Sequence, residues 1–329
     1  MKGITVTQSA EPLQLVTLEK PELKPETCLV KLCAAALNRR DQWIREGKYP
    51  NIQFNIILGS DGCGIVEEGP EEWLGKEVVF NPNVDWGNNP DVQSRNYSVL
   101  GMPTPGTLGE YIVVPTDRIH LKPTHLSTEE AAALPLGGLT AFRATMKKGL
   151  ASEGKNVLIT GAGGGVSQFA LAFSVASGAE TYVTSSSAEK IAKCLKLGVK
   201  QGFNYSDENW SKEAARIGFD VIIDGAGGNE VNNYLKIIHP GGRIVMYGST
   251  TGYPEKLDVF RLFWSQAQIM GATMGNDAEF EEMLAFVSQH QIRPTIDRVF
   301  PLTEYLKAFD RSATYYNVYI QGLCTLFHG

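Results

Sequence analysis

The chain of 329 residues has few of the side chains that build disulfide or metal frameworks. It contains five cysteines, an odd number with no Cys-x-x-Cys pair, and only five histidines. A disulfide scaffold or a four-cysteine zinc lobe is therefore not expected, and the cysteines are interpreted as small buried hydrophobic residues. No apolar run is long enough to span a bilayer and no basic tract is present, so neither a membrane nor a nucleic acid is expected as a partner.

The composition is that of a soluble globular protein, with 43% hydrophobic and 20% charged residues and a net charge of −6. The first residues lack the apolar core of a signal peptide, which predicts a cytoplasmic protein. Up to about Pro123, short β-branched runs are punctuated by Gly, Pro and Asn, a pattern typical of a compact, mostly antiparallel β domain. Residues 81–109 are polar with little periodicity and are interpreted as a long loop that lines a site.

From about residue 126 the rhythm changes to alternating strands and helices, which predicts a doubly wound parallel sheet and an α/β fold class. Strands are expected at 157–160, 180–184, 201–204, 220–224 and 242–248, and helices at 166–177 and 187–197. The alternation ends near 269–275, and the last part of the chain is expected to return to the first domain. The predicted division is 1–125 with 275–329 for the β-rich domain and 126–274 for the α/β domain.

The segment from Lys155 to Ala179 carries the strongest functional signal. A short buried strand is followed at once by a glycine cluster, residues 161–165, and then by apolar residues at helical spacing. Glycines let a backbone approach a pyrophosphate, and a helix start offers unpaired N–H groups with a positive dipole end. A glycine-rich turn is common by itself, but this strand–turn–helix context favours dinucleotide binding over an ordinary tight turn.

Eight segments of the chain together resemble the medium-chain dehydrogenase/reductase superfamily, and within it the zinc-free, quinone oxidoreductase-like branch. They read ALNRRDQWIREGKYP, LGSDGCGIVEE, GTLGEYIVVP, EEAAALPLGGLTAFRA, NVLITGAGGGV, VIIDGAGG, GGRIVMYGSTTG and IRPTIDRVFPL. The resemblance implies a GroES-like catalytic domain, a Rossmann domain and a site in the cleft between them. It also implies a homodimer in which the strand around residues 269–274 pairs across a twofold axis.

The chain departs from the zinc-dependent members of that superfamily at the metal ligands. Those members use a Cys and a Gly-His-Glu triplet, and the corresponding residues here are Asn38 and Gly59-Ser60-Asp61. The loop 81–109 contains no cysteine that could form their structural zinc lobe. Because neither a thiolate nor an imidazole is supplied, no metal site is predicted.

Without a metal ion, the expected hydride acceptor is one that can be reduced without a Lewis acid. Zn²⁺ acts as a Lewis acid that stabilises the charge developed when a simple ketone accepts a hydride. Quinones and α,β-unsaturated carbonyls delocalise that charge themselves, so hydrogen-bond donors at the carbonyl oxygen suffice.

The candidate catalytic residues are Asn38, Tyr49 and Asp41. In the family the matching Asn lies near the nicotinamide, and Tyr49 matches a substrate-pocket tyrosine that can donate a hydrogen bond or a proton. Asp41 is expected to hold the loop by capping. Without the resemblance, a turn-forming Asn, a packing Tyr and a solvated Asp are the better interpretations.

The end of the second strand of the α/β domain favours NADPH over NADH. NAD-binding sites place Asp or Glu there, whereas this chain has Ser185, Ser186 and Ser187, followed by Lys190. Hydroxyl donors and a cation suit the 2′-phosphate of NADPH, and Tyr205 matches a family tyrosine beside that phosphate. The alternative is a serine N-cap with Lys190 on a solvated helix face.

The phosphate loop is degenerate, because Ala162, Gly164 and Ser167 stand at the three glycine positions of the family. The family also ends with a Gly-Lys pair near the cofactor, and its replacement here by Tyr316-Asn317 weakens the NADPH prediction. The further residues predicted to bind the cofactor are Thr140, Gly163, Gly164, Gly165, Val166, Gly225, Gly227, Tyr247 and Gly248, whose glycines are alternatively ordinary turn residues.

The sequence thus predicts an NADPH-dependent oxidoreductase that transfers hydride to quinones or α,β-unsaturated carbonyls without a metal. Two alternatives stay open. One is an alcohol or aldehyde dehydrogenase with atypical zinc ligands, and the other is an NADPH-binding structural or sensory protein without turnover.

Overall fold

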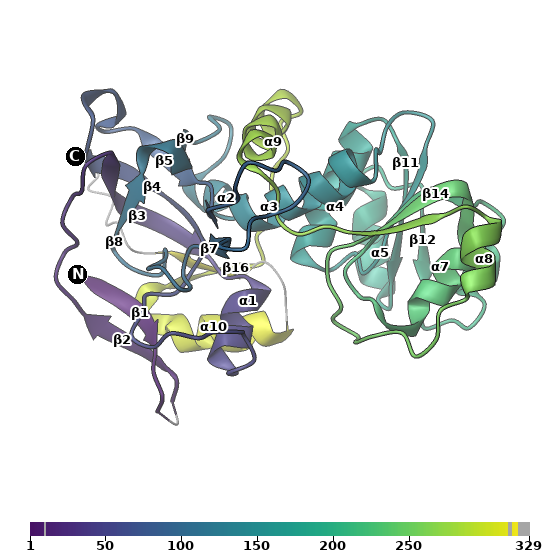
Figure 1. Ribbon diagram of the computed structural model, residues 1–329, viewed down its shortest axis with the longest axis horizontal. Helices are drawn as coiled ribbons and strands as arrows, with labels where there is room; N and C mark the ends of the chain where they lie inside the picture. Colours follow the sequence, from purple (N-terminus) through teal and green to yellow (C-terminus); the bar gives the residue numbers. More distant parts are fainter. Residues whose placement is uncertain (10, 315–317, 322–329) are drawn as a thin grey trace. The chain divides into compact units, whose positions relative to one another are not determined.

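The computed structural model describes residues 1–9, 11–314 and 318–321, and the chain divides into two compact units (Figure 1). The first, called the β-rich unit below, comprises Met1–Leu136 and Asn276–Gly329, and the second, the α/β unit, comprises Gly137–Gly275. The first boundary lies at residue 136 rather than at the predicted 125. The reason is that helix α2 (Thr128–Ala132) packs against strands of the β-rich unit.

The β-rich unit is built on a seven-stranded sheet of order β16-β17-β3-β4-β5-β9, in which β8 pairs with the first half of β3. All of its pairings are antiparallel except that of β16 with β17, and a separate hairpin joins β1 to β2. The strands are β1 (Lys2–Val6), β2 (Leu13–Thr17), β3 (Thr27–Ala36), β4 (Asp61–Glu68), β5 (Glu77–Phe80), β8 (Tyr111–Pro115), β9 (Ile119–Leu121), β16 (Arg298–Pro301) and β17 (Val318–Gln321).

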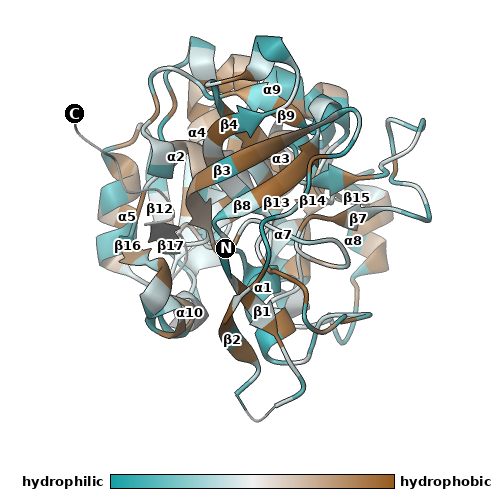
Figure 2. Ribbon diagram, turned by 90° about the vertical axis from the view of Figure 1, so that its left-hand side faces the viewer, coloured by the Kyte–Doolittle hydropathy of each residue, from teal (hydrophilic) through white to brown (hydrophobic). Residues whose placement is uncertain are grey.

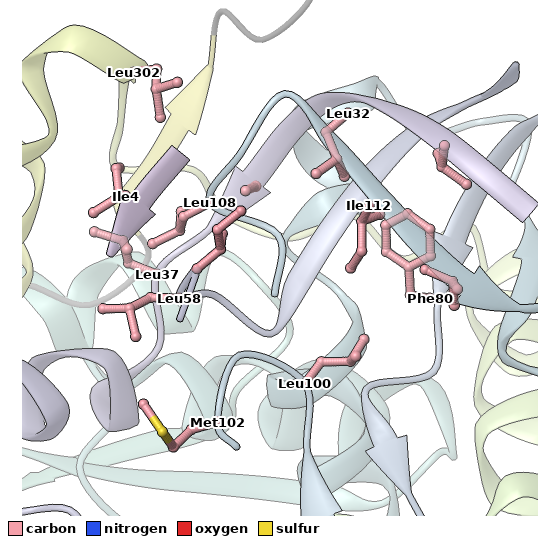
Figure 3. Packing of buried hydrophobic residues seen from close by; sticks show 14 of the residues in the cluster. Ile4, Leu32, Leu37, Leu58, Phe80, Leu100, Met102, Leu108, Ile112 and Leu302 are labelled. Atoms are coloured by element: carbon pink, nitrogen blue, oxygen red, sulfur yellow. The ribbon is translucent and has the colours of Figure 1, made fainter. Parts of the chain in front are cut away.

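The core of this unit lies against β3, which is hydrophobic along most of its length (Figure 2). Leu32, Leu58, Phe80 and Leu108 are fully buried there, and Figure 3 shows Phe80 beside Ile112 in the same cluster. Burying each such side chain contributes roughly 1.5–3 kcal/mol to stability. This rigid core fixes the ends of β3 and β4, from which the polar residues described below project.

The helices of the β-rich unit cover its sheet or flank its loops. They are α1 (Arg39–Arg45), α2, α9 (Asp277–Gln289) and α10 (Tyr305–Thr314). Helices α1 and α10 lie side by side (Figure 1) and are joined by an ion pair of 2.7 Å between Arg45 and Asp310. The predicted loop 81–109 contains a short antiparallel pair, β6 (Asn83–Val84) with β7 (Ser98–Val99).

The α/β unit contains a six-stranded parallel sheet of order β12-β11-β10-β13-β14-β15, in agreement with the predicted fold class. Its strands are β10 (Asn156–Ile159), β11 (Glu180–Ser185), β12 (Gln201–Asn204), β13 (Phe219–Asp224), β14 (Ile238–Met246) and β15 (Gln268–Gly271). The chain fills one half of the sheet from β10 to β12 and then returns to place β13 beside β10. The strand order therefore reverses between β10 and β13, the point where such sheets bind ligands.

Helices lie on both faces of this sheet, with α4 and α5 on one side and α7 and α8 on the other (Figure 1). The helices are α3 (Pro135–Phe142), α4 (Gly165–Ala176), α5 (Ala188–Leu195), α6 (Trp210–Ala214), α7 (Val231–Ile237) and α8 (Val259–Trp264). Strand β13 is buried along nearly all of its length, as expected for a central parallel strand covered on both faces. Within the described ranges, no helix has the length and apolar character needed to cross a membrane.

Candidate active site and cofactor site

The ends of β3 and β4 hold a cluster of polar residues in the β-rich unit. Asn38, half-buried, follows β3 and donates from Nδ2 to Asp61 Oδ2 at 2.9 Å. The second carboxylate oxygen of Asp61 accepts from the backbone N–H of Leu136 at 2.9 Å. The backbone N–H of Asn38 donates to Asp41 Oδ2 at 2.7 Å, so Asp41 caps helix α1 as predicted. These bonds fix the Asn38 amide at the end of a buried strand.

Arg40 is the centre of this cluster and was missed by the sequence analysis. Its Nη1 donates to Ser60 Oγ at 2.5 Å and to the Leu100 carbonyl at 2.6 Å. Its Nε and Nη2 both lie 3.3 Å from Tyr49 Oη, and Nη2 also lies 3.4 Å from the Met102 carbonyl. The side chain is buried, although a charged residue just beyond a strand is usually exposed.

Two buried carboxyl groups accompany this cation. Burial raises the pKa of Asp61 to about 8, against the opposing effects of the hydrogen bond from Asn38 and the charge of Arg40. Burial also raises the pKa of Asp41, and the charge of Arg40 opposes that rise. Both buried carboxyl groups therefore take up a proton more readily than exposed ones, which weakens the negative charge that opposes Arg40.

These residues do not fit a catalytic zinc ion. The Ser60 hydroxyl, which stands at the position of the histidine ligand, accepts a bond from Arg40 and donates to the Leu100 carbonyl at 2.8 Å. A further cation would be repelled by the neighbouring guanidinium. Across the described part of the chain, no group of three or more His, Cys, Asp or Glu side chains could hold a metal ion.

The predicted cofactor residues of the α/β unit gather at the carboxyl ends of four adjacent strands. Residues 163–166 follow β10, Ser185 and Ser186 end or follow β11, residues 225–227 follow β13, and residues 247–248 follow β14. Because parallel strands present their carboxyl ends at one edge of a sheet, the fold brings these loops together. Thr140 lies elsewhere along the chain, buried in α3, where its hydroxyl contacts the Met274 sulfur at 3.5 Å.

The turn after β10 has the strand–turn–helix geometry that the glycine pattern predicts. Helix α4 has twelve residues with Gly164 as its N-cap, so its first N–H groups open onto the turn. A Cβ added to Gly163 would lie 2.7 Å from Lys190 Nζ, so this ammonium group lies against the glycine turn. The turn fits a pyrophosphate, and it has a cation beside it.

Ser167, which replaces the third glycine of the family pattern, is accommodated by hydrogen bonds. The buried hydroxyl donates to the Thr160 carbonyl at 2.9 Å and lies 2.8 Å from Tyr247 Oη. Tyr247 packs closely on Gly225, where an added Cβ would lie 2.6 Å from the tyrosine ring. The sequence predicted these residues separately. In the structure they lie in contact with one another beside the carboxyl ends of β10, β13 and β14.

Asp224 at the end of β13 is a second residue that the sequence analysis missed. Its buried carboxylate accepts from Thr160 Oγ1 at 2.5 Å, from Tyr234 Oη at 2.9 Å and from the backbone N–H of Gly227 at 2.7 Å. These bonds anchor the turns after β10 and β13 to one another. The sequence signal that could have identified Asp224 is its position at the end of a strand, directly before the Gly-Ala-Gly turn.

Of the serines at the end of β11, one caps the next helix and another leaves its hydroxyl on the surface. Ser187 is an N-cap, because its hydroxyl accepts from the backbone N–H of Lys190 at 3.3 Å. Ser186 is exposed and accepts from Tyr205 Oη at 3.2 Å, so two hydroxyls stand together on the surface here. Tyr316 and Asn317, where the family carries its Gly-Lys pair, lie outside the described residues.

Comparison with known proteins agrees with both halves of this arrangement. Residues 24–124 match the family model of the alcohol dehydrogenase GroES-like domain, and residues 165–289 match that of the zinc-binding dehydrogenases. The zinc-type alcohol dehydrogenase-like protein YogA of Leptosphaeria maculans is 41% identical over 87% of this chain and 86% of its own. The chain belongs to the medium-chain dehydrogenase/reductase superfamily.

Members of this superfamily with other activities also align along most of the chain. A crotonyl-CoA reductase of Streptomyces avermitilis is 28% identical over 91% of this chain and 79% of its own. A crystal structure of an NAD-dependent alcohol dehydrogenase superposes with a TM-score of 0.91 at 32% identity, covering 98% of this chain and all of the other. The superfamily member described here is therefore an oxidoreductase with a GroES-like and a Rossmann-type unit.

Proposed function

We propose that this protein is an NADPH-dependent reductase that transfers a hydride to α,β-unsaturated carbonyls or quinones without a metal ion. The observation that carries the proposal is that Asn38 and Ser60, at two positions where zinc-dependent relatives place their ligands, are bonded to Asp61 and to the guanidinium of Arg40. This set offers hydrogen-bond donors and a fixed positive charge, but neither a thiolate nor an imidazole.

The acceptor that the relatives favour is an alkene conjugated to a carbonyl group. Crotonyl-CoA reductases align along 91% of this chain. Crotonyl-CoA, the substrate in their name, is an enoyl thioester of this kind. Conjugation spreads the incoming negative charge onto the carbonyl oxygen, so the site needs only donors for that oxygen. Quinones share this property and remain in the proposed substrate class.

The β-rich unit supplies two groups for this oxygen. The Asn38 amide uses one Nδ2–H for Asp61, and no acceptor among the described residues takes its second N–H, which it can donate. The Tyr49 hydroxyl, half-buried, accepts from Arg40 and carries a proton that it can donate. Because both groups are held by hydrogen bonds before substrate arrives, they stabilise developing charge without reorganisation.

The α/β unit supports NADPH as the hydride source. When bound, this cofactor supplies the hydride from its nicotinamide ring. The glycine turn would hold the pyrophosphate, and Lys190 with the hydroxyls of Ser186 and Tyr205 would hold the 2′-phosphate. The acid that would bind a free 2′-hydroxyl is missing, since Glu189 pairs with Lys193 at 2.8 Å.

The test is NADPH oxidation with a panel containing a quinone, an enone, a 2-enoyl thioester and a saturated ketone, each with and without a chelator. We expect turnover with the conjugated acceptors, little with the saturated ketone, and no effect of the chelator. Zinc-dependent oxidation of alcohols would instead establish the alcohol dehydrogenase alternative. Tight NADPH binding without turnover of any acceptor would establish the sensory or structural alternative.

We further propose that the protein forms a homodimer through the α/β unit. Strand β15 is an edge strand of the sheet, and an edge strand can pair with a second chain. Helix α8 precedes it and exposes Phe260, Phe263 and Trp264, with Trp264 75% exposed and its ring stacked on Phe260. A second copy that pairs at this edge would cover the apolar group.

A further inference from the structure

We propose that Arg40 is the positioning residue that turns the Tyr49 hydroxyl into a hydrogen-bond donor for the substrate. This inference rests on the proposed function and names a residue that the sequence analysis did not consider. Arg40 acts from the place where zinc-dependent relatives hold their ion, but it acts through Tyr49 and not on the substrate directly.

The donors of Arg40 are fully assigned. A guanidinium has five N–H groups, one on Nε and two on each terminal nitrogen. The two on Nη1 reach Ser60 Oγ and the Leu100 carbonyl, the one on Nε reaches Tyr49 Oη, and those on Nη2 reach Tyr49 Oη and the Met102 carbonyl. Arg40 thus has no N–H left for a substrate oxygen, which excludes a direct role as donor.

The Tyr49 hydroxyl, unlike the Arg40 guanidinium, keeps a hydrogen that it can donate to a substrate. Its oxygen receives two N–H groups of Arg40, both at 3.3 Å, which fills its capacity to accept. Among the residues that the structure describes, no acceptor takes the hydrogen of this hydroxyl, and the side chain is only half-buried. Tyr49 can therefore engage an incoming oxygen only as a donor.

The guanidinium also fixes where that hydroxyl points. The central carbon of Arg40 lies 4.9 Å from the centre of the Tyr49 ring, so the cation contacts both the ring and its hydroxyl. Arg40 is held in turn by Ser60, whose hydroxyl bonds the same Leu100 carbonyl. Ser60 thus positions Arg40, and Arg40 positions Tyr49.

A double-mutant cycle separates this role from a merely structural one. The variants are Arg40→Met, Arg40→Lys, Tyr49→Phe and the two double mutants, and kcat and KM are measured with NADPH and the best acceptor. Loss of a positioned proton donor typically costs on the order of 100-fold, so we expect that loss of kcat for Tyr49→Phe and a loss of at least about 10-fold for Arg40→Met. In the Tyr49→Phe background, Arg40→Met should lower kcat by less than about threefold, because the two side chains act as one unit.

Arg40→Lys keeps the positive charge but loses the bidentate hydrogen bond to the Tyr49 hydroxyl, so its kcat should lie between those of the wild type and Arg40→Met. The matched control is Arg216→Met, which makes the same change at an exposed arginine just before β13 and should leave kcat and the NADPH KM within about twofold of wild type. Multiplicative losses of kcat in both double mutants would overturn the proposal while leaving the proposed function intact. An inactive wild type would overturn the proposed function and this inference with it.

If neither Arg40 variant folds, the wild type and Tyr49→Phe carry the test. The exchange of the Arg40 Nε–H with solvent is followed by NMR on protein labelled with ¹⁵N-arginine. Loss of its acceptor in Tyr49→Phe should accelerate exchange by at least about tenfold, which corresponds to a hydrogen bond of about 1.4 kcal/mol. An unchanged exchange rate would show that Arg40 does not hold Tyr49 and would overturn the proposal.

Discussion

Two pairs of neighbouring cations look equivalent in the sequence and differ in the structure. Arg39 is exposed, whereas Arg40 is buried and binds Ser60 and Tyr49. On α5, Lys193 pairs with Glu189, whereas Lys190 reaches back to the glycine turn. The role of each side chain follows from distant segments that fold against it, which is why Lys190 was found through a family pattern and Arg40 was not found.

Lys190 gives a prediction on cofactor choice. We expect Lys190→Met to raise the dissociation constant for NADPH about tenfold, because a charge-assisted bond to phosphate is worth roughly 1.5–3 kcal/mol and this side chain is partly screened by solvent. Fluorescence titration of both cofactors checks this. The matched control is Lys196→Met, at the exposed C-terminal end of the same helix, which should bind NADPH as the wild type does. Equal losses in the two variants would remove Lys190 from the phosphate site.

Asp61 predicts a pH dependence of stability. Its pKa is raised by burial from 3.8 to about 8, so between these values the folded state holds a proton that the unfolded state has released. The unfolding free energy should therefore fall as pH rises through this window, by at most about 1.4 kcal/mol per pH unit, and level off above about pH 8.

Urea unfolding of the wild type and Asp61→Asn across this pH range measures the effect. The variant cannot take up the proton, so its stability should depend less on pH than that of the wild type. Parallel pH profiles for the two proteins would show that Asp61 is ionised in the folded state.

At the scale of elements, segments specified by local pattern were predicted well. The strand–turn–helix from β10 to α4 lies within one or two residues of its prediction, because a β-branched run, a glycine turn and a helical period each act over a few residues. The short pair β6–β7 was missed within the loop 81–109, since two-residue strands have no periodicity. The first domain boundary was misplaced because α2 is assigned by its packing and not by its own sequence.

The glycine turn yields a prediction that differs from that for Lys190. In Gly163→Val the new side chain would enter the turn and displace Lys190 Nζ, which lies 2.7 Å from the added Cβ. The pyrophosphate is common to both cofactors, so binding of NADPH and of NADH should weaken together, by at least about tenfold. The thermal midpoint should hardly change, because the substituted position is half-buried at a turn. Weakening confined to NADPH would contradict the assignment of this turn to the pyrophosphate.

At the scale of the whole molecule, each unit supplies one part of the proposed chemistry. The α/β unit carries the strand-end loops that fit a dinucleotide, and the β-rich unit carries the donors for an acceptor oxygen. The sequence predicted this division because the pattern changes from punctuated strands to strand–helix alternation along the chain. It could not predict what fills the metal position, since that depends on the approach of residues 38–40, Ser60 and Leu100 from three segments.

The proposed dimer is tested by size-exclusion chromatography with light scattering. The wild type should have twice the mass of the chain, 36.0 kDa, and Trp264→Glu should reduce it to the monomer by placing a charge in the apolar interface. Leu197→Glu, an exposed leucine just beyond α5, is the control and should remain dimeric. A monomeric wild type, or a dimeric Trp264→Glu with unchanged affinity, would contradict the assignment.

The central claim is that hydrogen-bond donors, the Asn38 amide and the Tyr49 hydroxyl held by Arg40, and not a metal ion, stabilise charge on the acceptor. The most direct measurement determines the zinc content of the purified protein by elemental analysis and, on the same sample, the rate of NADPH oxidation by a conjugated acceptor before and after chelation. The account predicts substoichiometric zinc and an unchanged rate. One zinc per chain, with activity lost on chelation and restored by added zinc, would contradict it.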